Sequence, residues 1–169
     1  MDGLETILTR RSIRNYTDRS INKDEYIQLI KAAVSAPSAG NQQPWQLVII
    51  QDKNILEKVL EFHPNAKMLI EAQGAILICG DLSKEKYKGF WVQDCAAAAQ
   101  NLLLAAHSMG LGACWLGIYP REDRVVGMKK LIAIPEKIIP LALVSIGYPA
   151  EEKPPSDRFT ESFVHYEKW

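Results

Sequence analysis

The chain has 169 residues, with twenty acidic and twenty basic side chains and a formal net charge of zero. That length suits a single domain with a substantial core, and the balanced charge argues against binding to nucleic acid or to an anionic membrane. The three cysteines form no CxxC pair and lie in apolar runs, so we expect buried thiols without a disulfide or a zinc site. No signal-peptide pattern opens the sequence, and we therefore expect a cytoplasmic protein.

The N-terminal segment combines a short amphipathic helix with a basic cluster. Apolar residues at helical spacing predict a helix over residues 4–11, which runs into Arg-Arg-Ser-Ile-Arg at residues 10–14. Three guanidinium groups and a hydroxyl suit a phosphate, because Arg donates bidentately and Ser adds a short neutral bond. A solvated basic helix end, favoured by the helix dipole, is the alternative. If Ile13 is anchored in the core, it fixes the directions of Ser12 and Arg14.

A second helix is predicted over residues 22–35, because Asn22 and Glu25 form a variant of the capping box before an apolar stripe. The loop at residues 36–45, Ala-Pro-Ser-Ala-Gly-Asn-Gln-Gln-Pro-Trp, then separates it from an apolar run. Its prolines stop the helix, its glycine permits positive φ, and its hydroxyl and amides offer hydrogen bonds without charge. This loop is either a plain helix stop or a binding loop for a polar, planar ligand, and its density of amides favours the second interpretation.

The remaining elements follow from apolar periodicity and from proline and glycine breaks. We expect the strand at residues 45–50 to be buried on both faces. The helix over residues 90–109 is apolar nearly all round and should be buried partly by a second subunit. Aromatic residues scattered along the charged, proline-rich tail should cover a partner subunit. The other predicted elements are helices at 53–62, 67–73 and 121–131 and strands at 75–79, 113–116 and 141–146.

The sequence offers no obvious protein nucleophile. There is no Gly-x-Ser-x-Gly elbow, and the three histidines lack metal-ligand spacing, so we expect no catalytic side chain and no metal. The glycines at 110 and 112 close a helix and do not follow a strand, which argues against a dinucleotide fingerprint. Phosphate-binding arginines beside an amide loop indicate a cofactor that carries the reaction itself.

Four segments together resemble the nitroreductase family of FMN-dependent oxidoreductases. They are Arg-Arg-Ser-Ile-Arg at 10–14, Pro-Ser-Ala-Gly-Asn-Gln-Gln-Pro-Trp at 37–45, the alanine-rich helix before Gly-Leu-Gly-Ala-Cys-Trp at 110–115, and Ile-Pro through Gly-Tyr-Pro at 134–149. The resemblance implies an α+β fold in which a mixed β-sheet is flanked by helices. It also implies an intertwined homodimer with exchanged C-terminal arms, so that residues 1–149 form an FMN-binding core and residues 150–169 an arm that embraces the partner.

The resemblance further implies which residues form the two FMN sites at the dimer interface. Four would hold the phosphate and the ribityl chain: Arg10, Arg11, Ser12 and Arg158. Two would lie near the flavin N1 and C2 carbonyl: Arg14 and Lys67. Four would come from the other subunit: Pro37, Ser38, Ala39 and Asn41. Two would lie near the N5 edge: Leu116 and Gly117.

The activity implied is a ping-pong transfer of hydride from NADH or NADPH, through flavin N5, to a nitroaromatic, a quinone or a similar small acceptor. Two alternatives keep the flavin: dehalogenation of an aromatic, or oxidation in a biosynthetic pathway on the same fold. A third is an FMN-binding protein without turnover. Between residues 81 and 90 the chain is too short for the helical lid of longer family members, so the site should be open.

Overall fold

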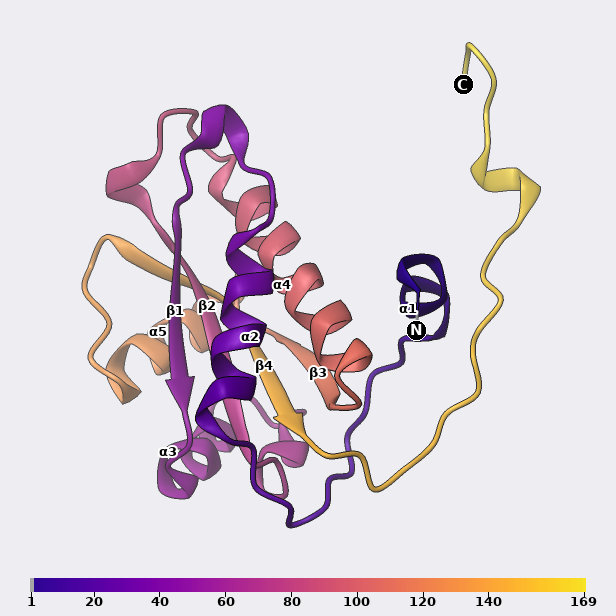
Figure 1. Cartoon of the computed structure of the whole chain (residues 1–169). Coiled ribbons are helices and arrows are strands. Elements are labelled where there is room, and N and C mark those ends of the chain that lie inside the picture. Colours follow the sequence, from indigo (N-terminus) through magenta and orange to yellow (C-terminus); the bar gives the residue numbers. More distant parts are fainter. Residues whose placement is uncertain (1) are drawn as a thin grey trace.

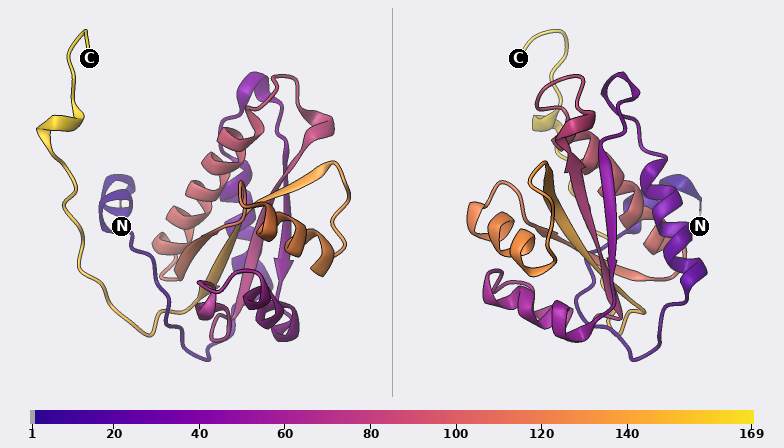
Figure 2. Two further views of the ribbon diagram at one scale, coloured as in Figure 1. Left: turned by 180° about the vertical axis from the view of Figure 1, so that it is seen from behind. Right: turned by 90° about the vertical axis from the view of Figure 1, so that its left-hand side faces the viewer.

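The computed structural model describes residues 2–169. Its architecture is α+β, with one four-stranded sheet between two layers of helices (Figures 1 and 2). In chain order the helices and strands are α1 (Gly3–Thr9), α2 (Lys23–Val34), β1 (Trp45–Ile50), α3 (Lys53–Lys58), β2 (Gly74–Asp81), α4 (Trp91–Ser108), β3 (Gly112–Gly117), α5 (Glu122–Leu131) and β4 (Ile138–Gly147).

The sheet has the strand order β1-β2-β4-β3, and all three ladders are antiparallel. The prediction was a mixed sheet; within residues 2–169 the parallel pairing is confined to a single bridge between Ser12 and Ala113. β1 lies at one edge, where Val48 and Ile49 are 38% and 36% exposed. The prediction that this strand is buried on both faces was therefore wrong, because an apolar run does not reveal whether a strand has a neighbour on each side.

Helices cover both faces of the sheet and enclose two hydrophobic cores. The right-hand view in Figure 2 shows α2 and α4 on one face and α3 and α5 on the other. The first core contains Leu29 of α2, Leu102 of α4 and Ile76 of β2, whereas the second contains Leu56 of α3 and Met128 of α5. The predicted long helix is confirmed as α4, within one residue at each end.

Local chemistry accounts for most helix boundaries. α1 and α2 both begin with a capping box, Asp2 with Glu5 and Asn22 with Glu25. The helix predicted at 53–62 is α-helical only to residue 58 and continues as a 3₁₀ turn, and the one predicted at 67–73 is a 3₁₀ turn of three residues. In both places the apolar pattern covers too few residues to distinguish an α-helix from a 3₁₀ turn.

Two parts of the chain, α1 and the tail after β4, lie outside the sheet and the helices that cover its faces. Figure 1 shows α1 beside α4, and the tail after β4 extending past α1 without joining the sheet. Side chains on both parts expose apolar surface: Leu4 is 66% exposed, Phe163 72% and Tyr166 84%. No helix among residues 2–169 is long and apolar enough to cross a membrane.

Candidate functional site: a cationic segment beside β3

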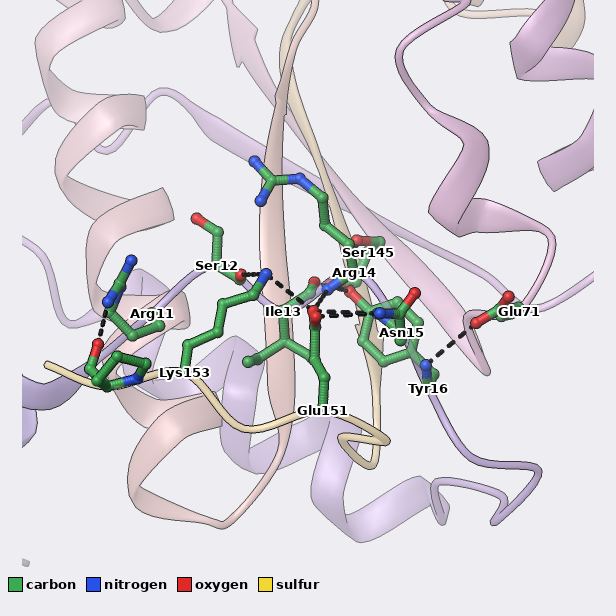
Figure 3. A network of polar contacts seen from close by, with 11 residues as sticks. Arg11, Ser12, Ile13, Arg14, Asn15, Tyr16, Glu71, Ser145, Glu151 and Lys153 are labelled. Atoms are coloured by element: carbon green, nitrogen blue, oxygen red, sulfur yellow. Dashed lines mark hydrogen bonds and ion pairs between the residues drawn. The ribbon is translucent and has the colours of Figure 1, made fainter.

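The basic cluster at residues 10–14 is held in an extended conformation against the edge strand β3. Ile13 donates its backbone N–H to the carbonyl of Ala113 at 3.1 Å, and the bridge from Ser12 to Ala113 runs parallel. A Cβ on Gly112 would lie 2.7 Å from Ile13 Cγ2, so glycine is what lets Ile13 pack so closely. Because side chains alternate along an extended chain, Ser12 and Arg14 share the face opposite Ile13, as Figure 3 shows.

The segment is clamped from outside by the root of the tail. The carboxylate of Glu151 accepts the backbone N–H of Arg14 at 2.6 Å and the side-chain amide of Asn15 at 3.0 Å. Lys153 Nζ lies 2.9 Å from the same carboxylate and donates to the carbonyl of Ser12 at 2.9 Å (Figure 3). Burial alone would raise the pKa of Glu151, but the Arg14 N–H and Lys153 outweigh it and keep that pKa below its ordinary value.

Cys114 of β3 is a buried thiol that lies near several of these cationic side chains. Burial raises its pKa, while the nearby charges of Arg14, Lys153 and Arg10 oppose that rise. Cys114 is therefore a neutral thiol and not a nucleophile. Arg10 and Arg14 therefore both lie near enough to Cys114 of β3 for their charges to act on its thiol.

Arg10 and Arg158 meet from opposite ends of the chain. Both line a hollow of about 490 Å³ between α1 and residues 155–159. Burial lowers the pKa of Arg10 and the nearby charge of Arg158 lowers it further, and neither arginine takes part in an ion pair of residues 2–169. Asp157 also lines this hollow, but its carboxylate accepts the backbone N–H of Phe159 at 3.1 Å and forms an ion pair with neither arginine within residues 2–169. The two guanidinium groups therefore remain available to bind an anion such as a phosphate group.

The other predicted cations line two further hollows, and Arg11 lines the smaller of these, of about 340 Å³. Arg14 and Lys67 line the larger, of about 420 Å³, together with Asn65 and Glu71. Arg11 points away from Ser12 and Arg14, and its guanidinium donates to the carbonyl of Pro154 in the tail (Figure 3). Arg11 thus contacts the tail directly.

The predicted N5-edge residues lie at the end of β3. Leu116 is 5% exposed, and Arg124 of α5 donates Nη1 to the carbonyl of Gly117 at 2.7 Å. Next to Arg124 lies His63, 3% exposed, whose two ring nitrogens have no hydrogen-bond partner among residues 2–169. Burial and then the charge of Arg124 lower the pKa of His63, which is therefore neutral at pH 7.

The amide loop lies elsewhere. Figure 1 shows the α2–β1 loop, which contains Pro37, Ser38, Ala39 and Asn41, at the upper end of β1, whereas the segment between α1 and α2 descends on the other side of α4. One chain therefore does not bring these four residues to the cationic segment.

Comparison with known proteins decides the family. The model described as "Nitroreductase family" matches residues 7–76 and 63–148. A protein of Methanothermobacter thermautotrophicus, provisionally named NADH dehydrogenase/NAD(P)H nitroreductase, is 48% identical over 169 residues, covering all of this chain and 88% of its own length. The chain belongs to the nitroreductase family.

Solved structures agree with this assignment across the whole chain. A Parabacteroides distasonis structure with the same provisional name superposes with a TM-score of 0.95 at 42% identity, covering 98% of each chain. The FMN-dependent nitroreductase of Clostridium difficile R20291 superposes with a TM-score of 0.90 at 28% identity, covering 98% of this chain and 99% of its own.

Sequence reasoning missed residues of this nitroreductase-family chain that fix its candidate site. Glu151 and Lys153 belong to the stretch interpreted only as a charged, proline-rich tail, although their alternating spacing lets both face the cationic segment. Asp94 counts in the sequence only as a polar residue in an apolar helix, yet it is 4% exposed and bonded to the amide loop. A lone acid in an otherwise apolar stretch was the available signal.

Proposed function

We propose that this chain is an FMN-dependent oxidoreductase that takes reducing equivalents from NADH or NADPH and passes them to a nitroaromatic, a quinone or a similar small acceptor. The observation that carries the proposal is the meeting of Arg10 with Arg158 in one hollow, formed by α1 and residues 155–159. The FMN-dependent relative at a TM-score of 0.90 supports the choice of cofactor. Bound FMN would supply the redox chemistry.

The protein's own residues bind and orient that cofactor. Arg10 and Arg158 would hold the phosphate with charge-assisted bonds, and Ser12 and Arg11 would complete the binding of the phosphate and the ribityl chain. Arg11 also holds the tail through its bond to the carbonyl of Pro154. Arg14 and Lys67 provide positive charge near N1 and the C2 carbonyl, which favours the reduced state. Leu116 and Gly117 would lie near the N5 edge, and the hydrogen bond from Arg124 to the carbonyl of Gly117 would help to fix that backbone.

A second copy of the chain completes each site in this proposal. The amide loop lies apart from the cationic segment within one chain, so Pro37, Ser38, Ala39 and Asn41 would reach the flavin of the other subunit. Exposed aromatic residues on the tail and apolar residues on α1 leave more hydrophobic surface than a stable monomer favours. Residues 1–149 would form the core, and residues 150–169 an arm over the partner.

The three cysteines are free and buried, which suits a reducing compartment such as the cytoplasm.

Flavin titration tests the proposal. FMN should bind far more tightly than riboflavin, because riboflavin lacks the phosphate. Charge-assisted bonds contribute roughly 1.5–3 kcal/mol each, so replacing both Arg10 and Arg158 by alanine should weaken FMN binding by about 100-fold or more. Riboflavin binding should change little in that variant. Equal affinity of the wild type for FMN and riboflavin would contradict the phosphate assignment.

A further inference from the structure

The amide loop is shaped by a buried carboxylate that the proposed function does not use. Asp94, in the first turn of α4, accepts the backbone N–H of Ala39 at 2.9 Å and the side-chain amide of Gln42 at 2.6 Å. Asp94 is 4% exposed and Gln42 6%, and no ion pair of residues 2–169 includes Asp94. A buried charge that relies on amide donors alone requires those donors at fixed positions.

Gln42 extends this contact to a second loop. Its carbonyl oxygen accepts the backbone N–H groups of Lys86 at 2.8 Å and Tyr87 at 3.2 Å, in the segment between β2 and α4. The ring of Tyr87 lies on Gly40, where a Cβ would come within 2.4 Å of ring carbon Cε2. These hydrogen bonds therefore join α4 to the amide loop, and the amide loop to the short segment between β2 and α4, where longer family members have a helical lid.

The backbone of the amide loop needs this support. Gly40, Asn41 and Gln43 have φ values of 51°, 53° and 47°, so two non-glycine residues within three positions adopt the left-handed region. Such conformations cost of order 1 kcal/mol each and persist where the surroundings determine them. The bonds from Asp94 to Ala39 and Gln42 bracket Gly40 and Asn41, and Gln43 follows directly, with its backbone N–H donated to the hydroxyl of Ser38 at 3.0 Å.

We propose that Asp94 and Gln42 are positioning residues for the flavin site: they hold residues 38–43 in the conformation that contacts FMN and make that conformation depend on residues 85–87. The inference rests on the proposed function, because it is FMN of the second subunit that the amide loop would contact. Neither side chain needs to touch the cofactor.

Reciprocal substitution tests the geometry. In Asp94→Asn, one carboxamide must satisfy two donors, so an N–H faces an N–H either at Ala39 or at Gln42. In Gln42→Glu, two carboxylate oxygens face each other. In the double variant Asp94→Asn/Gln42→Glu, the new amide at position 94 accepts from Ala39 and donates to the new carboxylate at position 42. That carboxylate still accepts from Lys86 and Tyr87, so every bond is restored, and only the bond between positions 94 and 42 has its donor and acceptor exchanged.

We expect each single variant to bind FMN at least about 10-fold more weakly than the wild type, and the double variant to return to within about 3-fold. Asn101→Ala is the matched control, since it removes a 3.2 Å bond from α4 to the carbonyl of Ala32 without touching either loop. It should bind FMN as the wild type does. Single variants that bind like the wild type, or a double variant no better than the singles, would overturn the inference.

Amide hydrogen exchange, measured without flavin, separates this inference from the proposed function. The N–H groups of Ala39, Lys86 and Tyr87 should exchange slowly in the wild type, faster in both single variants, and slowly again in the double variant. If the wild type bound no FMN, the proposed function would fail, yet this exchange pattern would still support the connection between the loops. Exchange unchanged by either single substitution would refute it.

Discussion

Replacing Glu151 by glutamine tests whether the root of the tail fixes the cationic segment. The carboxylate accepts three bonds from Arg14 and Asn15, at 2.6, 3.0 and 3.3 Å, and pairs with Lys153 at 2.9 Å. A hydrogen bond to a charged group contributes about 1.5–3 kcal/mol and a neutral one about 0.5–1.5 kcal/mol. Since the Glu151 side chain is 19% exposed and its pair with Lys153 is partly solvated, we expect Glu151→Gln to lower the free energy of unfolding by about 1–2 kcal/mol at pH 7.

The effect should depend on pH in a defined direction. The folded-state pKa of Glu151 lies below its ordinary value, so its contribution is fully present above the unfolded pKa of about 4.3. It is lost as the pH falls through the folded pKa, and the stabilities of wild type and variant should converge there.

Denaturant unfolding at one fixed protein concentration, repeated from pH 7 down to acid pH, measures this difference. Glu152→Gln is the matched control, because it removes the same charge from the exposed neighbouring residue. A Glu151→Gln curve that follows the Glu152→Gln curve at every pH would show that the clamp contributes nothing.

Three further changes test the roles of His63, of Arg14 and of the C-terminal tail. Burial lowers the pKa of His63, so wild-type stability should fall as the pH drops below about 6.5, and His63→Leu should reduce that slope in the same unfolding assay; an unchanged slope would contradict this. Arg14→Ala should lower the midpoint potential of bound FMN by about 30–65 mV, as measured by redox titration, while Arg14→Lys keeps most of the effect. Truncation after Pro149 removes Arg158 and the aromatic tail, and sedimentation should then show a monomer without flavin; a flavin-loaded dimer would disprove the role of the arm.

The order and type of the long elements could be predicted from the sequence because each has a local cause. The capping box at Asn22 and Glu25 and the apolar stripe behind it define α2, and α4 follows from its centre, which is rich in alanine and leucine. The strand prediction at residues 45–50 matches β1, but the place of β1 at the sheet edge depends on pairing with distant residues, which an apolar run does not encode.

For the candidate site, sequence reasoning identified the cations but not what holds them. Arg10 and Arg158 are separated by most of the chain, and their proximity was expected only from the family resemblance. The bonds of Glu151 to Arg14, and of Asp94 to Ala39, are long-range contacts to backbone N–H groups. Backbone donors have no sequence signature, so an acidic residue that binds them is indistinguishable in the sequence from one that faces solvent.

An absorption spectrum of the purified protein tests whether it binds FMN and reduces it with NADH or NADPH. After saturation with FMN and removal of unbound flavin, the protein should retain the visible flavin absorption. That absorption should disappear when NADH or NADPH is added without oxygen, and return when a quinone or a nitroaromatic follows. A protein that retains no FMN, or whose bound flavin neither NADH nor NADPH bleaches, would contradict the account.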